Sequence, residues 1–297
     1  MSNNNKQNFF AVFGLLFGAV CWGIIWYPYR LMDEAGFSGI VSSFYTYSMA
    51  ILIGCVIFGR HWRGVFALPK SAIALCLAAG WTNLSYVLAV IDGEVMRVML
   101  LFYLSPLWTL ILAHFWLKEP IYRQGLIAIV ISLVGALIML HDFSSNNWPI
   151  PRNQAEWLAL SSGIGFSLTN VITRHSTHLS IAAKSMLVWV GVASMALILL
   201  PLMGQHLPAM SAFNATQWQL MLLIAALLTA ATIFVQYGIT KITAIRASVL
   251  FLFELVVAAV ASYYLANEAM TWNEWLGGAL IIAAALISAT QSSVHHE

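Results

Sequence analysis

Charge is the property that this sequence has least of. Only 8% of its 297 residues are Asp, Glu, Lys or Arg, whereas 61% are apolar and the mean hydropathy is +0.84. Soluble domains carry about 25% charged and about 45–50% apolar residues, so this chain has too few charged side chains to cover a water-facing surface. We therefore predict an integral membrane protein. The formal net charge of +2 provides no basic field for a nucleic acid partner.

Cysteine is scarce as well, and enzyme motifs are missing. Cys21, Cys55 and Cys76 lie in apolar stretches without the spacing of metal ligands, which argues against a disulfide framework or a zinc site. The sequence contains no HExxH motif and no glycine-rich phosphate loop followed by lysine. We accordingly predict no metal, no cofactor and no enzymatic activity.

Long apolar runs are what the sequence has in abundance. A membrane-spanning helix needs about 20 apolar residues. Ten such runs are present, near 9–31, 38–59, 71–90, 95–117, 122–140, 156–174, 181–203, 217–238, 244–265 and 273–291. The short connections between them leave no room for a soluble domain, and the longest, 141–153, lies at the middle of the chain. The predicted fold class is an all-α integral membrane protein with ten transmembrane helices.

The distribution of Lys and Arg predicts the orientation of these helices. With both termini on one side, ten of the 13 Lys and Arg residues fall on that side, and only Arg30, Arg97 and Arg152 fall on the other. Positive residues concentrate in cytoplasmic loops. We therefore predict a multi-pass protein of a bacterial-type inner (plasma) membrane, with both termini in the cytoplasm.

Under a shift of 149 residues, the segment from Trp81 to about Pro120 aligns with the second half of the chain without gaps. The aligned identities are Arg97 with Arg246, Leu101-Phe102 with Leu250-Phe251, and Glu119 with Glu268. Each half then holds five helices, and because five is odd the second half is inverted relative to the first. Inverted repeats are a recurrent construction of secondary transporters. The predicted domains are a first repeat over 1–142, an extracytoplasmic linker over 143–155 and a second repeat over 156–297.

Several motifs resemble those of the EamA branch of the drug/metabolite transporter superfamily. The residues that carry the resemblance are Trp22-Gly23, Lys118-Glu119, Gly125, Gly135, Glu254, Asn267-Glu268, Trp275, Gly277 and Gly278. The resemblance implies a ten-helix carrier with a central cavity lined mainly by helices 1, 3, 4, 6, 8 and 9. The family often has Glu-Pro in helix 9, whereas this chain has Glu254-Leu255 there and a proline, Pro106, only in helix 4. We therefore expect a kinked helix 4 and a straight helix 9.

Glu254 and Pro106 are the candidate coupling and gating residues. Glu254 lies in the middle of a predicted span, where a charged carboxylate costs about 2.5–3.5 kcal/mol on insertion scales. It is either a proton-coupling group or counter-ion for a substrate ammonium, or a protonated structural group that is hydrogen-bonded to a neighbouring helix. Pro106 lies at the matching depth of helix 4, where its kink is either part of a gate or static.

The remaining candidate substrate-binding residues are aromatic or polar side chains inside the spans. They are Trp22, Trp26, Trp81, Asn83, Tyr86, Ser105, Trp108, Asn170 and Gln236. Deep aromatic rings that line a cavity favour an amphipathic organic solute and can hold a cation. Deep amides need partners for four bonding sites. Packing between helices is the alternative explanation for each of these residues.

Taken together, these features predict a secondary transporter. Its substrate would be a small amphipathic metabolite, an amino acid or a related nitrogenous compound, moved by alternating access through the lipid bilayer. Protons are a candidate coupling ion, and export is favoured only by family analogy. An intramembrane lipid-modifying enzyme and a membrane scaffold or sensor without transport are the alternatives. The sequence leaves the metabolite, the direction, the coupling and the oligomeric state open.

Overall fold

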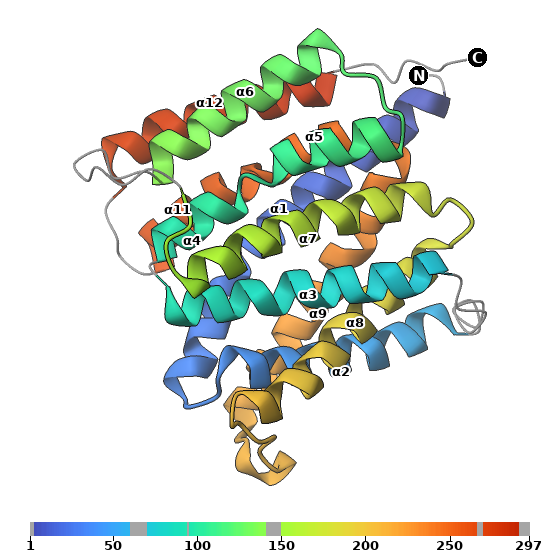
Figure 1. The fold of residues 1–297 in the computed structure, drawn as a ribbon. Coiled ribbons are helices and arrows are strands. Elements are labelled where there is room, and N and C mark those ends of the chain that lie inside the picture. Colours follow the sequence, from blue (N-terminus) through green and yellow to red (C-terminus); the bar gives the residue numbers. More distant parts are fainter. Residues whose placement is uncertain (1–2, 60–69, 94, 141–149, 266–269, 291–297) are drawn as a thin grey trace.

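The computed structural model describes residues 3–59, 70–93, 95–140, 150–265 and 270–290, and within these ranges every regular element is a helix (Figure 1). The first half contains α1 (Asn3–Glu34), α2 (Gly39–Phe58), α3 (Lys70–Asp92), α4 (Val95–Phe102), α5 (Ser105–Trp116) and α6 (Arg123–Leu140). The second half contains α7 (Gln154–His175), α8 (Ile181–Leu202), the short 3-10 helix η2 (Met210–Ala212), α9 (Ala215–Lys241), α10 (Ala244–Phe251), α11 (Phe253–Leu265) and α12 (Trp272–Thr290).

The ten predicted spans are confirmed, with α4 and α5 forming the fourth and α10 and α11 the ninth. Their ends agree with the predicted ranges within a few residues, apart from α1, which begins earlier. Among the described residues, nine spans are by themselves long and apolar enough to cross a membrane, and α7 is not one of them. Helix α7 is as long as the other spans but carries more polar residues than they do. These residues are accommodated because α7 packs against α3, α4 and α5 inside the bundle.

Two of the spans are broken at equivalent points of the two halves. The fourth is interrupted between α4 and α5, and the ninth is interrupted at Leu252, between α10 and α11. The shift that aligns Arg97 with Arg246 also places both ends of α4 on both ends of α10. The expectation of a straight helix 9 is therefore wrong. Phe251 and Leu252 are buried at the break, so tertiary packing produces there the interruption for which helix 4 has a proline.

Pro106 lies at the start of a helix and not inside one. It occupies the first turn of α5, where backbone N–H groups have no intrahelical acceptor and proline is well tolerated. Because a residue in the first turn needs no intrahelical acceptor, no backbone hydrogen bond is lost at Pro106. The expected kink of helix 4 is therefore an interruption between α4 and α5.

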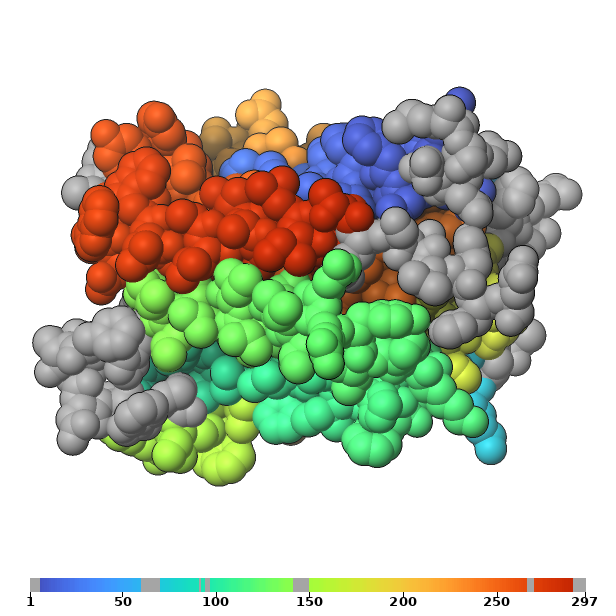
Figure 2. Space-filling view, turned by 90° about the horizontal axis from the view of Figure 1, so that it is seen from above, coloured from blue at the N-terminus to red at the C-terminus, as the bar shows by residue number. Residues whose placement is uncertain are grey.

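The helices pack in a pattern that repeats when the two halves are exchanged. Helix α1 packs along α9, and its counterpart α7 packs along α3, while α6 packs along its own counterpart α12. Figure 2 shows α6 and α12 side by side on one face of the molecule. A Cβ atom on Gly135 of α6 would lie 2.8 Å from the Gly277 carbonyl oxygen of α12, so only glycine permits this close approach. The chain is thus built from two inverted five-helix repeats.

Some predicted features lie outside the described residues. They include the Asn267-Glu268 motif and most of the predicted linker, at 143–149. The exact repeat boundaries at 142/143 and 155/156 therefore stay predictions.

Candidate functional site

A cluster of aromatic rings lies where the two broken helices meet. Phe102 ends α4 and Phe251 ends α10, and these two repeat-related rings pack on Phe166 of α7 with centroid distances of 5.6 and 5.1 Å. Trp22 of α1 lies 5.7 Å from Phe251, and Tyr86 of α3 lies 4.9 Å from Phe102. We call these five residues the aromatic cluster. Such spacings are those of favourable edge and tilted aromatic pairs.

Glu254 lies beside the aromatic cluster, in the first turn of α11. Its side chain is partly exposed, and the Tyr103 hydroxyl at the other helix break is close enough to interact with its carboxylate. The Tyr86 hydroxyl is close enough to interact with the same charge. A helix N-terminus favours negative charge. A carboxylate of the second repeat therefore faces tyrosines of the first.

The Trp22-Gly23 motif brings α1 close to the backbone of α11. A Cβ atom on Gly23 would lie 2.9 Å from the Glu254 carbonyl oxygen and 2.8 Å from the Val257 side chain. Any larger residue would push α1 away from α11. The small residue thus explains how Trp22 reaches the aromatic cluster at Phe251.

The structure separates the other predicted aromatic residues from the aromatic cluster. The Trp26 ring contacts Tyr27, at 5.6 Å. Trp81 is 40% exposed and donates from Nε1 to the Ser161 hydroxyl at 3.3 Å, so it lies at the outer edge of the α3–α7 contact. Trp108 follows the break by one turn of α5, and its buried Nε1 has no partner among the described residues.

The predicted polar residues lie on four different helices, α3, α5, α7 and α9. The Ser167 hydroxyl of α7 donates to the carbonyl of Ser105, the first residue of α5, at 2.8 Å. Asn170 of α7 and Gln236 of α9 are buried, and Asn170 Nδ2 and Gln236 Oε1 have no partner within the described part of the chain. Asn83 of α3 donates to the Tyr47 hydroxyl at 3.1 Å. Unpaired buried amides are costly, so Asn170 and Gln236 have unused hydrogen-bonding capacity.

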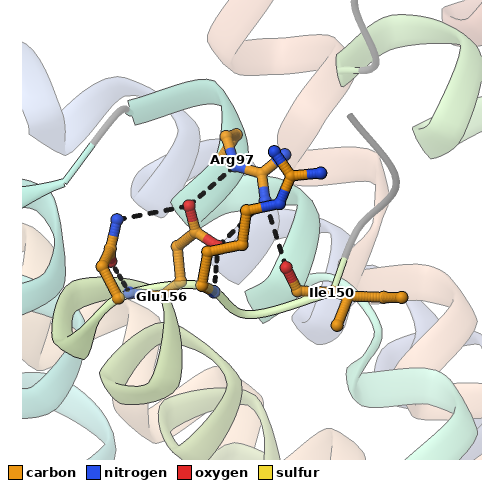
Figure 3. A network of polar contacts seen from close by, with 5 residues as sticks. Arg97, Ile150 and Glu156 are labelled. Atoms are coloured by element: carbon orange, nitrogen blue, oxygen red, sulfur yellow. Dashed lines mark hydrogen bonds and ion pairs between the residues drawn. The ribbon is translucent and has the colours of Figure 1, made fainter. Parts of the chain in front are cut away.

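Two repeat-related arginines, which the sequence analysis did not count as site residues, join the repeats. Arg97 donates to both carboxylate oxygens of Glu156, at 2.7 and 2.9 Å, and to the Ile150 carbonyl at 3.2 Å (Figure 3). Arg246 donates to the Ser288 carbonyl at 2.8 Å and to Asn8 Oδ1 at 3.3 Å. The sequence feature that pointed to both arginines was the repeat alignment. It aligned the two arginines with each other but did not identify the groups to which they bond.

Within the described residues, the short helices α4 and α10 pack differently at the two ends of the bundle. We call the end at which α10 begins the terminal end, because the start of α1 and the end of α12 lie there (Figure 1). At this end α10 packs against α5, α6 and α7. Within the described residues, the equivalent contacts of α4 with α11, α12 and α1 at the far end are absent or marginal. The two repeats therefore adopt different conformations around one shared centre.

Comparison with known proteins agrees with this architecture. The chain matches the EamA-like transporter family over residues 9–141 and 153–290. The chain belongs to this family. An uncharacterized transporter of Archaeoglobus fulgidus is 24% identical over 76% of this chain and 78% of its own. A riboflavin transporter of Brucella anthropi is 25% identical over 88% of this chain and 91% of its own. Protein RarD of Salmonella typhi is 25% identical over 42% of this chain and 44% of its own.

A solved crystal structure shares the fold. It superposes with a TM-score of 0.75 over 94% of this chain and 96% of its own, at 13% identity. An EamA transporter is a multi-pass membrane protein of the drug/metabolite transporter type, so the prediction of a small-molecule transporter is confirmed at this level.

Proposed function

We propose that this EamA transporter moves a small, amphipathic, nitrogen-containing metabolite by alternating access. The observation that carries the proposal is the placement of Glu254 beside the aromatic cluster, between the two broken helices. Trp22, Tyr86, Phe102 and Phe166 are all partly exposed although they lie at the centre of the bundle. Rings and a carboxylate together suit a solute with an apolar or flat portion and a cationic or hydrogen-bonding nitrogen.

The broken helices provide the moving parts of this mechanism. In transporters built from inverted repeats, the substrate site lies at discontinuous helices, and the two repeats exchange conformations around it. Here Phe102 and Phe251 occupy the same position in the two repeats and both touch Phe166. The solute would displace these contacts in turn as access alternates. The relative named a riboflavin transporter supports a flat, nitrogen-rich solute, as does the unused hydrogen-bonding capacity of Asn170 and Gln236.

Glu254 is the coupling or recognition group in this proposal. A carboxylate that binds a proton when the solute leaves would link transport to a proton gradient, with the Tyr103 hydroxyl as its partner in the empty site. Glu254→Gln should then abolish gradient-driven accumulation and retain exchange. Accumulation that persists in Glu254→Gln would refute proton coupling through this residue.

The orientation is part of the proposal. Ten of the 13 Lys and Arg residues lie on the side of the termini, which supports cytoplasmic termini in an inner membrane. The terminal end is then the cytoplasmic end, and the structure is closed toward the cytoplasm. Export remains the favoured direction by family analogy, and the repeats are proposed to span 1–142 and 156–297.

Counterflow in proteoliposomes tests the proposal. Vesicles would be loaded with a pool of amino acids, flavins and other amphipathic metabolites, and exchange would be followed by mass spectrometry. Exchange of one chemical class that is lost in Phe166→Ala and kept in Trp81→Phe is expected, because Trp81 lies outside the aromatic cluster. Exchange of no metabolite by folded protein would refute the proposed substrate class and favour the alternatives of an intramembrane lipid-modifying enzyme or a scaffold.

A further inference from the structure

The connection between α5 and α6 places a buried carboxylate at the terminal end. Glu119 is 8% exposed. Its two oxygens accept the Ala244 N–H at 3.2 and 3.0 Å, and Oε1 lies 3.6 Å from Arg174 Nε. Ala244 is the first residue of α10, and the N–H groups in the first turn of a helix have no intrahelical acceptor. Glu119 thus caps the helix that closes this end of the bundle.

The backbone around Glu119 is built to aim its side chain inward. Lys118 has a φ of 56°, the left-handed conformation that ends α5, and a non-glycine residue adopts it at a cost of about 1–2 kcal/mol. The Glu119 N–H then donates to the Ala113 carbonyl at 3.1 Å. The His114 Nδ1 lies 3.2 Å from the Glu119 carbonyl oxygen, which can only accept. Both contacts fix the turn.

Every side-chain partner of Glu119 belongs to the other repeat. Glu119 is in the first repeat, whereas Arg174 of α7 and Ala244 of α10 are in the second. Arg174 also donates to the Thr240 carbonyl of α9, and the buried Lys184 donates to the Thr240 hydroxyl at 3.0 Å. Glu119 is therefore the acidic member of a polar network that joins the connection after α5 to α7, α8, α9 and α10.

We propose that Glu119 is a gating residue that latches the terminal end shut. Its bonds to the Ala244 N–H exist only while α10 lies against the connection after α5, and they must break each time this end opens, whereas Arg174 of α7 holds the carboxylate in position for them. This inference rests on the alternating-access function proposed above. It adds a residue that neither binds the substrate nor lies at the helix breaks, and that positions α10 during the transport cycle.

The balance of forces at Glu119 suits a contact that must open and close. Burial raises the pKa of Glu119 above its ordinary value, and the bonds to Ala244 and Arg174 only partly offset this effect. Taking a carboxylate out of water costs much of what its ion pair provides. The latch therefore holds α10 in place without making the closed state too stable to leave.

Distances between spin labels test the latch without any substrate. In a background with the three cysteines replaced by alanine, one label pair at Arg123 and Lys241, both exposed, would report on the terminal end. A second pair at Asp92 and Trp272, also exposed, would report on the far end. Glu119→Ala in lipid nanodiscs should lengthen the first distance and shorten the second. We expect about a tenfold rise in the ratio of terminal-end-open to closed molecules, equivalent to about 1.4 kcal/mol.

Matched variants separate the latch from general loosening. Glu34 pairs with Arg30 of its own helix, and both side chains are more than half exposed, so Glu34→Ala should leave both distances unchanged. Glu119→Gln keeps an acceptor oxygen for Ala244 and should give a smaller shift, and Arg174→Gln removes the ion pair while it keeps the cap and should do the same.

Unchanged distances in Glu119→Ala would overturn the latch. Lengthening of both distances would also overturn it, because that result indicates loosening and not alternation. If Glu119→Ala does not fold, unchanged distances in both Glu119→Gln and Arg174→Gln would overturn it equally. If the distances shift as expected while counterflow finds no exchanged metabolite, the latch stands and the proposed substrate class fails.

Discussion

Removal of the Glu156 carboxylate should destabilise the fold far more than removal of an exposed carboxylate. Glu156 accepts two bonds from Arg97, one from the Arg152 N–H at 2.9 Å and one from the Asn153 side chain. Its side chain is 4% exposed and that of Arg97 is 12% exposed. Glu156→Gln therefore removes the carboxylate that pairs with a guanidinium whose side chain is only 12% exposed. Truncating one member of a buried pair costs about 3–5 kcal/mol.

The Arg30–Glu34 pair provides the matched control. Its members lie 3.1 Å apart on one helix, but their side chains are 55% and 58% exposed, and exposed pairs of this spacing contribute about 0.3–0.5 kcal/mol. Unfolding of wild type, Glu156→Gln and Glu34→Gln in mixed micelles, followed by tryptophan fluorescence, would measure both free energies. We expect a loss of about 3 kcal/mol or more for Glu156→Gln and less than about 1 kcal/mol for Glu34→Gln.

A double-mutant cycle decides whether Arg97 is responsible. Arg97→Met combined with Glu156→Gln should recover much of the loss, because no unpaired charge remains. Equal losses for Glu156→Gln and Glu34→Gln would refute the reasoning. A double mutant as unstable as the sum of the single mutants would show that the two groups do not act together.

Three further predictions concern the interior and the terminal end. Phe166→Ala removes the ring on which Phe102 and Phe251 pack and should cost about 3–5 kcal/mol of unfolding free energy, measured in the same micelles. Relative to Leu255→Ala, which removes the same buried side chain, Leu255→Pro should cost about 1 kcal/mol, because the bond to the Leu252 carbonyl is the one that proline removes. The same change at Val260, inside α11, should cost about 3 kcal/mol or more. Burial raises the pKa of Glu119, so its protonated form stabilises the folded state. This contribution to the free energy of unfolding is fully present when the pH is below the ordinary pKa of Glu, and it is lost as the pH rises through the raised pKa. The melting temperature of wild type should therefore fall relative to Glu119→Gln as the pH rises over this range, and a constant difference would contradict this.

Apolar periodicity and repeat alignment predicted most of the fold. The ten spans and the inverted repeat could be read from residues that recur at helical lengths and at one fixed shift, and the family was indicated by motifs that resemble those of EamA transporters. The break at Leu252 could not, because no proline or glycine marks it and the packing of Phe251 and Leu252 creates it. Local sequence signals such as proline, glycine and apolar periodicity do not report tertiary contacts. This interruption depends on such contacts.

The candidate site was predicted only in part. Glu254, Trp22 and Tyr86 were identified because polar or large aromatic residues deep in a span are conspicuous. Phe102, Phe166 and Phe251 resembled ordinary apolar residues, and only the folded packing brings these rings together. Lys184 was counted as a marker of orientation, but the fold buries it completely against Thr240. The partner of a charged group on another helix is a property of tertiary structure.

The polarity of α7 has a consequence for how the protein is made. Among the described spans, α7 is the one that is too polar to qualify as a membrane span by length and composition alone. Its buried polar side chains include Ser162, Ser167 and Asn170, and Ser162 and Ser167 donate to the carbonyl groups of Thr82 in α3 and Ser105 in α5. These partners are synthesised earlier in the chain. We therefore expect α7 to insert stably only when the helices of the first repeat are present to accept its polar side chains. On this expectation, expression of the second repeat alone would leave α7 outside the membrane more often than expression of the whole chain.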